Sequence, residues 1–372
     1  MNRRKRALKA LHIEEPDRVP ITEMDIDVPH LEALTGKTFT GEVSLQTSVS
    51  ADRRMEAIKV EIKTECYRKL KFDVITCDLS APDGWKSVRN PDGTITDEWG
   101  RVLIHDSRCK TWFPYRSVFQ TPEDFESFSF PDPHAAGRTF GVEYMKKIVG
   151  DEMAVAAFIR DPFAHAWEMF TPITFVKWMY AEPRIVRKAI EKLTDFNVEI
   201  IKQLADLGVD FIISGGDYSE KKGPMVPVKY FREVVFPGLK KQVEAAHKKG
   251  IKFIKHTDGN VHPLVDDLAN IVDGLHSLDP SAGVDIGEVK AKYGDKLVLM
   301  GNVAVDSLAR KTKKEVVDET KECIRRASPG GGHFLTSSNS WYTDAKLENC
   351  LAMVKTGRKH GKYPISIFNE LY

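Results

Sequence analysis

The sequence predicts an α/β protein with the (β/α)₈ fold of a TIM barrel, and three observations support this prediction. Short apolar segments typical of buried strands alternate with helical patterns, and they begin near Ile21, Val74, Ala154, Phe211, Ile251, Leu275, Leu297 and His333. The chain has 372 residues, 42% of them hydrophobic, and such barrels commonly reach this length as one domain with insertions. No Gly-x-Gly-x-x-Gly fingerprint follows an early strand, which disfavours the doubly wound open sheet, the main alternative. We therefore predict a single barrel domain over residues 1–372.

The first residues predict a helical extension that precedes the barrel. Ala7, Leu8, Leu11 and Ile13 are spaced for one face of a short amphipathic helix packed on the body. Further helices are expected over residues 51–70, 164–170, 173–180, 183–207 and 228–249, and around Val265, Val289, Val316 and Met353. Three consecutive glycines at 330–332 come before the last strand, so we interpret them as a turn and not as a phosphate cradle.

Residues 84–119 interrupt the alternation and predict a β insertion. The Asn-Pro-Asp-Gly sequence at 90–93 is a turn signal between two alternating segments, as in a β-hairpin. This stretch is rich in aromatic residues, namely Trp85, Trp99, Trp112, Phe113 and Tyr115. We favour the interpretation that they form the insertion's own small core; the alternative is that some of them line a ligand pocket.

Composition excludes several classes of partner. The 55 basic and 54 acidic side chains give a net charge of +1, so no general bias towards nucleic acid or anionic membrane exists. The five cysteines are an odd number without a Cys-x-x-Cys pair, which favours a reducing compartment. The sequence shows neither a signal peptide nor an apolar run of about 20 residues. We expect a soluble cytoplasmic protein, and a homodimer stays open.

Polar residues cluster where the predicted strands end, which is where barrel enzymes place their active sites. His256 and Asp258 follow the strand that begins at Ile251, and this pair could bind a metal or a proton, although a satisfied buried histidine and an ordinary Asp-Gly turn are the plainer alternative. The other strand ends contribute Glu23, Asp25, Asp27, Asp78, Arg160, Asp161, Asp217, Tyr218, Asp279, Asn302, Asn339, Trp341 and Tyr342. For Asp161 and Asp344 we expect only helix capping. This rim is rich in acids and aromatics and poor in basic groups, which suits a metal ion and a flat apolar substrate better than a polyanion.

Five short motifs resemble the uroporphyrinogen decarboxylase superfamily. They are Asp-Arg-Val-Pro at 17–20, Phe-Asp-Val-Ile at 72–75 leading to Cys77-Asp78, Gly216-Asp217, His-Thr-Asp-Gly-Asn at 256–260 and Gly-Asn-Val-Ala at 301–304. The resemblance implies a (β/α)₈ fold. It also implies one of two activities, that of the haem-pathway decarboxylase or that of the cobamide-dependent methyltransferases of anaerobes.

Departures from the decarboxylase pattern disfavour uroporphyrinogen as the substrate. That branch carries an Arg-Gln-Ala-Gly-Arg-Tyr type segment after its first strand, whereas this chain has Glu23-Met24-Asp25-Ile26-Asp27. Acids at this place would repel a substrate with many carboxylates. A late Leu-Gly-His-Gly segment is also missing, and Ser338-Asn339-Ser340 stands there instead.

The methyltransferase branch often binds zinc through His-x-Cys and a later cysteine, and here too the chain departs. Asp258 stands at the first cysteine position and Asn339 near the second, so the resemblance implies a harder site that suits activating an ether oxygen better than a thiol. The leading hypothesis is a corrinoid-dependent methyltransferase (O-demethylase) that demethylates a methoxylated aromatic compound and passes the methyl group to Co(I) of a separate corrinoid protein. His256 and Asp258 would bind Zn²⁺, or serve as acid and orienting carboxylate without it.

The remaining roles in this hypothesis follow from position at the rim. Asp217, Asp78 and Glu23 are further ligand or acid candidates. Tyr218, Trp341 and Tyr342 would stack on the substrate ring, and Asn339 would contact the substrate. Two alternatives stay open: a decarboxylase or lyase of another substrate that uses Asp78 and Asp217, and a cobamide- or tetrapyrrole-binding scaffold without catalysis.

Overall fold

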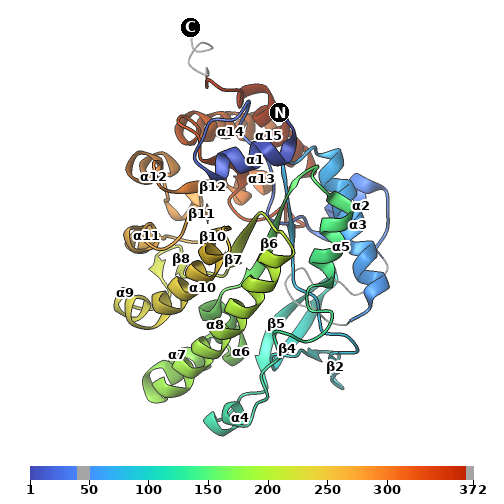
Figure 1. Cartoon of the computed structure of the whole chain (residues 1–372), viewed down its shortest axis with the longest axis vertical. Helices are drawn as coiled ribbons and strands as arrows, with labels where there is room; N and C mark the ends of the chain where they lie inside the picture. The colour runs from blue at the N-terminus through green and yellow to red at the C-terminus, as the bar shows by residue number, and fades with distance from the viewer. Residues whose placement is uncertain (40–50, 366–372) are drawn as a thin grey trace.

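The computed structural model describes residues 1–39 and 51–365, and a curled parallel sheet is its centre (Figure 1). The sheet has seven strands, and neighbours along it follow the order β1 (Val74–Cys77), β6 (Ala154–Arg160), β7 (Phe211–Gly215), β10 (Lys252–Thr257), β11 (Gly274–Ser277), β12 (Val298–Val303) and β13 (His333–Ser337). Every strand predicted from Val74 onward is therefore present. The prediction of a (β/α)₈ barrel is confirmed.

Residues 20–22 occupy the eighth position and close the barrel. Ile21 forms a parallel bridge with Leu335, and its carbonyl oxygen accepts a 2.8 Å hydrogen bond from the Asp73 N–H on the other side. The strand predicted from Ile21 therefore lies at the predicted position, but it forms an isolated β-bridge and not a full strand. Threonine hydroxyls replace some of the backbone hydrogen bonds between this segment and β1. Thr22 Oγ1 donates to the Val74 carbonyl at 2.8 Å, and Thr76 Oγ1 donates to the Met24 carbonyl at 2.5 Å.

Helices surround the barrel in the predicted order. The predicted ones are α3 (Arg53–Lys69), α6 (Pro162–Phe170), α7 (Pro172–Ala181), α8 (Pro183–Asp206), α11 (His262–Leu268), α12 (Ile286–Tyr293), α14 (Lys313–Ala327) and α15 (Leu347–His360). Four more were not predicted: α2 (Val28–Thr35), α4 (Pro122–Glu126), α5 (Phe140–Val149) and α13 (Val305–Arg310). None of the helices in the described ranges has the length and apolar character needed to cross a bilayer.

The helix expected over residues 228–249 has an interruption near its start. It divides into α9 (Val228–Tyr230), a π-helical turn η1 (Phe231–Val235) and α10 (Phe236–Lys248). Pro237 lies in the first turn of α10 and has no N–H to donate to the carbonyl of Glu233. The change of helix type therefore falls where the regular hydrogen-bond ladder cannot continue.

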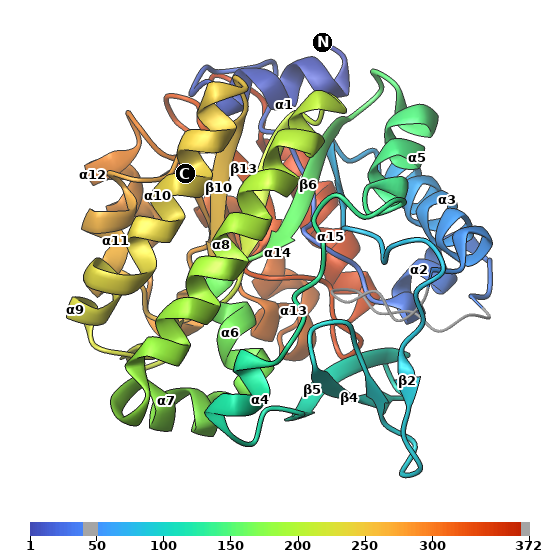
Figure 2. The same cartoon turned by 60° about the horizontal axis from the view of Figure 1, so that its bottom comes forward.

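The interior of the barrel is a packed apolar core that continues into the N-terminal helix. Alternate strand residues such as Ala156, Phe211 and Ile254 form one buried cluster with Ala7, Ala10 and Leu11 of α1 (Arg3–Leu11). Figure 2 shows α1 at the opposite end of the barrel from α7, β4 (Arg101–Asp106) and β5 (Thr111–Ser117). The predicted N-terminal helix is confirmed, and it covers the end of the barrel where the strands begin.

The predicted β insertion is a four-stranded antiparallel sheet of β2 (Val88–Arg89), β3 (Ile95–Thr96), β4 and β5. Its own core is small and consists of Ile95, Leu103 and Trp112. Trp99 points instead towards the barrel, where the centre of its ring lies 4.3 Å from the centre of the His165 ring on α6. The insertion's aromatics therefore divide between an internal core and the barrel. Phe113 and Tyr115 are exposed.

The glycine run at 330–332 is a turn before β13, as predicted. All three glycines have φ between 71° and 79°, a region that side chains disfavour. Gly331 also packs so closely that a Cβ there would lie 2.5 Å from the Glu14 carbonyl carbon.

Candidate active site

Three polar side chains meet at the C-terminal ends of β7 and β10. His256 belongs to β10, Asp258 follows it directly, and Asp217 comes from the loop after β7. One ligand atom from each of them lies within 4.8 Å of the other two. The parallel strands bring these residues together because their carboxyl ends share one edge of the sheet.

Hydrogen bonds fix the two carboxylates of this cluster. The Asp258 N–H donates to Asp217 Oδ1 at 3.0 Å, and Asn339 Nδ2 donates to Asp258 Oδ2. Asp258 Oδ1 lies 3.9 Å from His256 Nε2 and makes no hydrogen bond of good geometry among the described residues, although the Ser277 hydroxyl is close enough to lower the pKa of Asp258. One carboxylate oxygen is thus buried without the partner that such an atom needs.

Burial controls the protonation of the cluster. Burial lowers the pKa of His256 to about 4, against the raising effect of Asp217, and the charges of Lys255 and Arg160 lower it further. Burial raises the pKa of Asp258 to about 7, and the neighbouring Asp217 carboxylate adds to this effect. At neutral pH the imidazole is therefore neutral and able to act as a ligand, while Asp258 can hold or release a proton.

The cluster has the chemistry of a metal site. A neutral imidazole and two carboxylates are ligands for Zn²⁺ and other first-row divalent ions, and metal-to-ligand distances near 2.0–2.2 Å place ligands of one ion a few ångströms apart. The orphaned Asp258 Oδ1 would gain a partner, and the cation would offset the charges of two adjacent carboxylates. The residues present fit a divalent cation held by Asp217, His256 and Asp258.

His276 lies behind His256 and was missed in the sequence. It sits on β11 directly opposite His256 in the parallel register, and the two Nδ1 atoms are 2.7 Å apart. Its Nε2 faces Thr336 Oγ1 on β13 at 3.3 Å. One signal could have identified it. His276 is the third residue of the predicted Gly-Leu-His-Ser strand, and side chains that are opposite each other on neighbouring strands, as His256 and His276 are, lie on the same face of the sheet.

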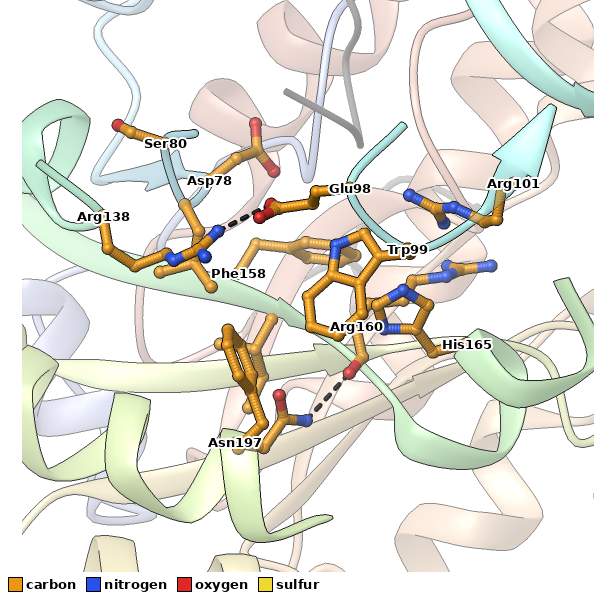
Figure 3. Close-up of a pocket in the computed structure, with 13 residues that line it drawn as sticks. Asp78, Ser80, Glu98, Trp99, Arg101, Arg138, Phe158, Arg160, His165 and Asn197 are labelled. Carbon is orange, nitrogen blue, oxygen red and sulfur yellow. Dashed lines mark hydrogen bonds and ion pairs between the residues drawn. The ribbon is translucent and has the colours of Figure 1, made fainter. Parts of the chain in front are cut away.

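Asp78 lies in a separate cavity between the barrel and the insertion (Figure 3). The cavity has a volume of about 60 Å³, room for a few water molecules. Asp78 directly follows β1, Arg160 ends β6, and Glu98, Trp99 and Arg101 come from the insertion. Burial raises the pKa of Asp78 to about 6, against the lowering effect of Lys59 and Lys63. The structure therefore does not bring Asp78 into the cluster of Asp217, His256 and Asp258.

The expectation of a rim poor in basic groups is wrong, because three arginines converge on this cavity. Arg101 Nη1 donates to Glu168 and Arg138 Nη1 to Glu98, both at 2.6 Å, and Arg160 also pairs with Glu168. Arg101 and Arg138 come from the insertion and from the loop before α5, far from the strand ends in sequence. Their charges are compensated by acids, so the cavity lacks the free positive charge that a polyanion would require.

Two of the predicted stacking residues are inside the core. Tyr218 is fully buried, its hydroxyl donates to Asp161 at 2.7 Å, and Lys255 Nζ lies 4.0 Å from the centre of its ring. Trp341 is also fully buried and packs edge-on against Phe72. Neither ring presents a face to a ligand in the mouth, so we remove both from the substrate site.

The other predicted residues divide between the core and the mouth. Glu23 is fully buried and accepts hydrogen bonds from Ser337, and burial raises its pKa to about 8. Asn339 and Tyr342 are partly exposed near the mouth. Asp161 caps α6 through the Phe163 N–H, as expected, and also pairs with the buried Lys255. Asp344 does not cap α15, whose N-cap residue is Lys346.

Comparison with known proteins identifies relatives over most of the chain. A family model described as uroporphyrinogen decarboxylase (URO-D) matches residues 114–360. The uroporphyrinogen decarboxylase of Methylococcus capsulatus is 24% identical over 256 residues, which are 65% of this chain and 70% of that protein. That of Actinobacillus succinogenes is 22% identical over 261 residues, 64% of this chain and 68% of that protein.

Two solved structures share the fold. A methyltransferase from Methanosarcina mazei superposes with a TM-score of 0.73 at 17% identity, covering 96% of this chain and 99% of its own. A B12-independent methionine synthase from Shewanella sp. W3-18-1 superposes with a TM-score of 0.55 at 12% identity, covering 92% of this chain and 97% of its own. At these identities the likeness shows the fold alone. Because the family model spans more than half of the sequence, this chain belongs to the uroporphyrinogen decarboxylase family.

Proposed function

We propose that this protein is a corrinoid-dependent methyltransferase that demethylates a methoxylated aromatic compound and transfers the methyl group to Co(I) of a separate corrinoid protein. The observation that carries the proposal is the Asp217, His256 and Asp258 cluster at the mouth of the barrel. Its ligands are nitrogen and oxygen, with no cysteine among them, so it favours substrates that are activated at oxygen.

Cleavage of an aryl methyl ether needs help at the oxygen atom. The methyl group leaves without the bonding electrons, the two electrons that bind it come from Co(I), and the ether oxygen becomes a phenolate unless it is neutralised. Zn²⁺ held by Asp217, His256 and Asp258 would supply a Lewis acid for that oxygen. The chain's own part is to hold the ligands: Asn339 and the Asp258 N–H fix the two carboxylates, and His276 supports His256.

Uroporphyrinogen decarboxylation is a poor match for this chain. Asp25 and Asp27 follow the segment that closes the barrel, and the arginines of the nearby cavity are already paired with Glu98 and Glu168. A substrate with many carboxylates would meet acids and occupied arginines.

A second candidate is a decarboxylase or lyase acting on another substrate. It is favoured by the names of the sequence relatives and by Asp78, whose raised pKa, in a cavity that Arg160 also lines, suits an acid that stabilises an intermediate. Release of CO₂ in the absence of any corrinoid would identify this activity.

A methyl-transfer assay tests the proposal. The Zn²⁺-loaded protein is incubated with a reduced corrinoid protein and either 2-methoxyphenol or a methoxybenzoate, and methyl-cobalt formation is followed by absorbance. We expect methyl-cobalt with the wild type and a rate at least about tenfold lower with Asp258→Asn, the usual scale for disturbing a metal site. Asp266→Asn, at an exposed site paired with Lys292, is the matched control and should keep the wild-type rate.

Two results would contradict the proposal. The first is the absence of methyl-cobalt with every methoxylated donor. The second is retention of full corrinoid binding by His256→Ala and Asp258→Ala variants, together with no stoichiometric metal in the wild type, which would favour the non-catalytic scaffold.

A further inference from the structure

His256 and His276 form a buried pair whose geometry limits where their protons can be. They are partners in the parallel register of β10 and β11, and their side chains are almost fully buried. Their Nδ1 atoms are 2.7 Å apart, which is hydrogen-bond distance. A gap of this length holds one hydrogen, so one Nδ1 donates and the other accepts. The pair therefore has two arrangements, which differ in which ring donates.

Thr336 selects between these two arrangements. Its hydroxyl donates to the Ser337 carbonyl oxygen at 2.6 Å, which uses its only hydrogen. The same oxygen lies 3.3 Å from His276 Nε2 and can only accept there. His276 Nε2 must then carry a hydrogen, and a neutral His276 has an unprotonated Nδ1. The hydrogen between the rings consequently belongs to His256 Nδ1.

This assignment determines the free nitrogen of His256. With its hydrogen on Nδ1, the neutral ring presents a lone pair at Nε2. That atom lies 3.9 Å from Asp258 Oδ1, which makes no hydrogen bond of good geometry among the described residues. A separation of 3.9 Å is one that two ligands of a single cation can have.

We infer that His276 is a positioning residue that, with Thr336, fixes His256 in the Nδ1–H tautomer and so makes Nε2 the ligand atom of the site. The inference deepens the proposed function. The tautomer of His256 does not depend on that function, and only the role of the bound metal in methyl transfer rests on it. Binding of a divalent ion then requires neither a change of tautomer nor a rotation of the His256 ring. Buried partners of this kind orient metal-binding histidines and raise their basicity.

The tautomer can be observed directly in the wild-type protein. In protein labelled with ¹⁵N-histidine, long-range ¹H–¹⁵N spectra at neutral pH should show His256 with a protonated Nδ1 and an unprotonated Nε2. Addition of Zn²⁺ alone should shift the Nε2 resonance and leave Nδ1 protonated. A protonated Nε2 on His256 in the metal-free protein would overturn the inference, and this measurement needs no variant.

Substitutions at His276 and Thr336 test the same point through metal affinity. His276→Leu removes the acceptor and should weaken Zn²⁺ binding by about 10- to 100-fold, measured by calorimetry. His276→Asn places an amide oxygen near the former Nδ1 and should restore much of the affinity. Thr336→Val should yield a mixture of His256 tautomers, whereas Thr336→Ser should not.

A matched control separates positioning from general damage. Ser328 lies 2.7 Å from Nδ1 of His333, another buried histidine outside the site. Ser328→Ala should leave Zn²⁺ affinity unchanged. Equal affinity losses in Ser328→Ala and His276→Leu would overturn the inference. So would wild-type affinity in folded His276→Leu.

Failure of the proposed function gives a different result. If the expected tautomer and the His276 effect on Zn²⁺ binding are found but no methyl transfer occurs, the positioning role stands and the methyltransferase proposal falls.

Discussion

Asp258 is the residue on which the chemistry of the site depends most. In the proposed site it would provide an oxygen ligand two residues after His256. Its raised pKa also couples metal binding to the release of a proton, since a metal ligand must be deprotonated. We therefore expect this one side chain to set the metal preference of the proposed site.

Asp258→Cys should shift that preference towards soft ions. A thiolate beside His256 should raise the affinity for Cd²⁺ relative to Mn²⁺ by about tenfold or more, on the scale at which ligand changes alter metal sites. Competition calorimetry with the two ions measures the ratio. Asp258→Asn is the control, because it should weaken both ions. An unchanged ratio in Asp258→Cys would show that Asp258 is not a ligand.

Glu23 makes the stability of the fold depend on pH. Its carboxyl is fully buried, and burial raises its pKa to about 8 from an ordinary value of 4.5. The folded state then keeps a proton that the unfolded state loses, so its stabilising contribution is complete below pH 4.5 and is lost as the pH rises to 8. The slope is at most about 1.4 kcal/mol per pH unit. Urea unfolding between pH 5 and 9 should show this decline in the wild type, and Glu23→Gln should flatten it. A parallel decline in both proteins would assign the effect to another group.

The sequence could predict some residues of the site and not others, for a physical reason. His256, Asp258 and Asp217 meet because the strands are parallel and end at one edge, which the pattern of strands already implied. Tyr218 and Trp341 were assigned to the substrate because they follow strand ends, yet both turn into the core. The direction of a loop side chain depends on packing partners such as Asp161 and Phe72, which are distant in sequence.

At the scale of elements, Asp73 joins the segments that close the barrel. Its buried carboxylate accepts hydrogen bonds from Arg6 of α1, from Arg18, and from the Ile21 N–H, at 2.7–3.0 Å. The eighth strand position is held by side chains as much as by backbone pairing. This is why its sequence is short and weakly strand-like, and why only its place could be predicted.

Asp73→Asn should destabilise the fold by about 3 kcal/mol, because Arg6 and Arg18 both lose a buried carboxylate partner, although Arg6 keeps Asp17. The midpoint of urea unfolding provides the measurement. The matched control is Asp151→Asn, at an exposed carboxylate paired with Arg4, where we expect a change below about 1 kcal/mol. Similar losses in the two variants would show that Asp73 has no special part in closure.

The insertion was predicted as an element, but its relation to the barrel was not. Arg101 of β4 is buried between Asp97 and Glu168 of α6 and thereby connects the insertion to the barrel wall. An ion pair 67 residues apart in sequence leaves no local pattern. For this reason the sequence showed Arg160 at the rim but missed Arg101 and Arg138.

At the scale of the whole molecule, the two ends of the barrel have separate tasks. Leu11 of α1 packs into the core where the strands begin, and the Asp217, His256 and Asp258 cluster lies where they end. Because the two sites lie at opposite ends of the barrel, changes at one should add to changes at the other.

Thermal and urea unfolding with and without Zn²⁺ test this separation. Zn²⁺ at 100 times its Kd should stabilise the wild type by about 2.7 kcal/mol. Leu11→Ala should lower the stability by about 2–5 kcal/mol while keeping the Zn²⁺ increment. Asp258→Asn should have the opposite effect: the stabilisation by Zn²⁺ should disappear, and the stability without Zn²⁺ should change little. Loss of the increment in Leu11→Ala would mean that the two ends are coupled.

The helix that fills one end of the barrel has a kinetic consequence. With α1 packed against the strand beginnings, we expect molecules to reach the Asp217, His256 and Asp258 cluster from the opposite end of the barrel. A small methyl donor and a protein acceptor would have to share this entrance, so the donor enters before the protein covers it, and the demethylated product departs after the protein has left. Steady-state rates should then follow a compulsory order, and a large excess of the corrinoid protein should inhibit competitively against the methoxylated compound.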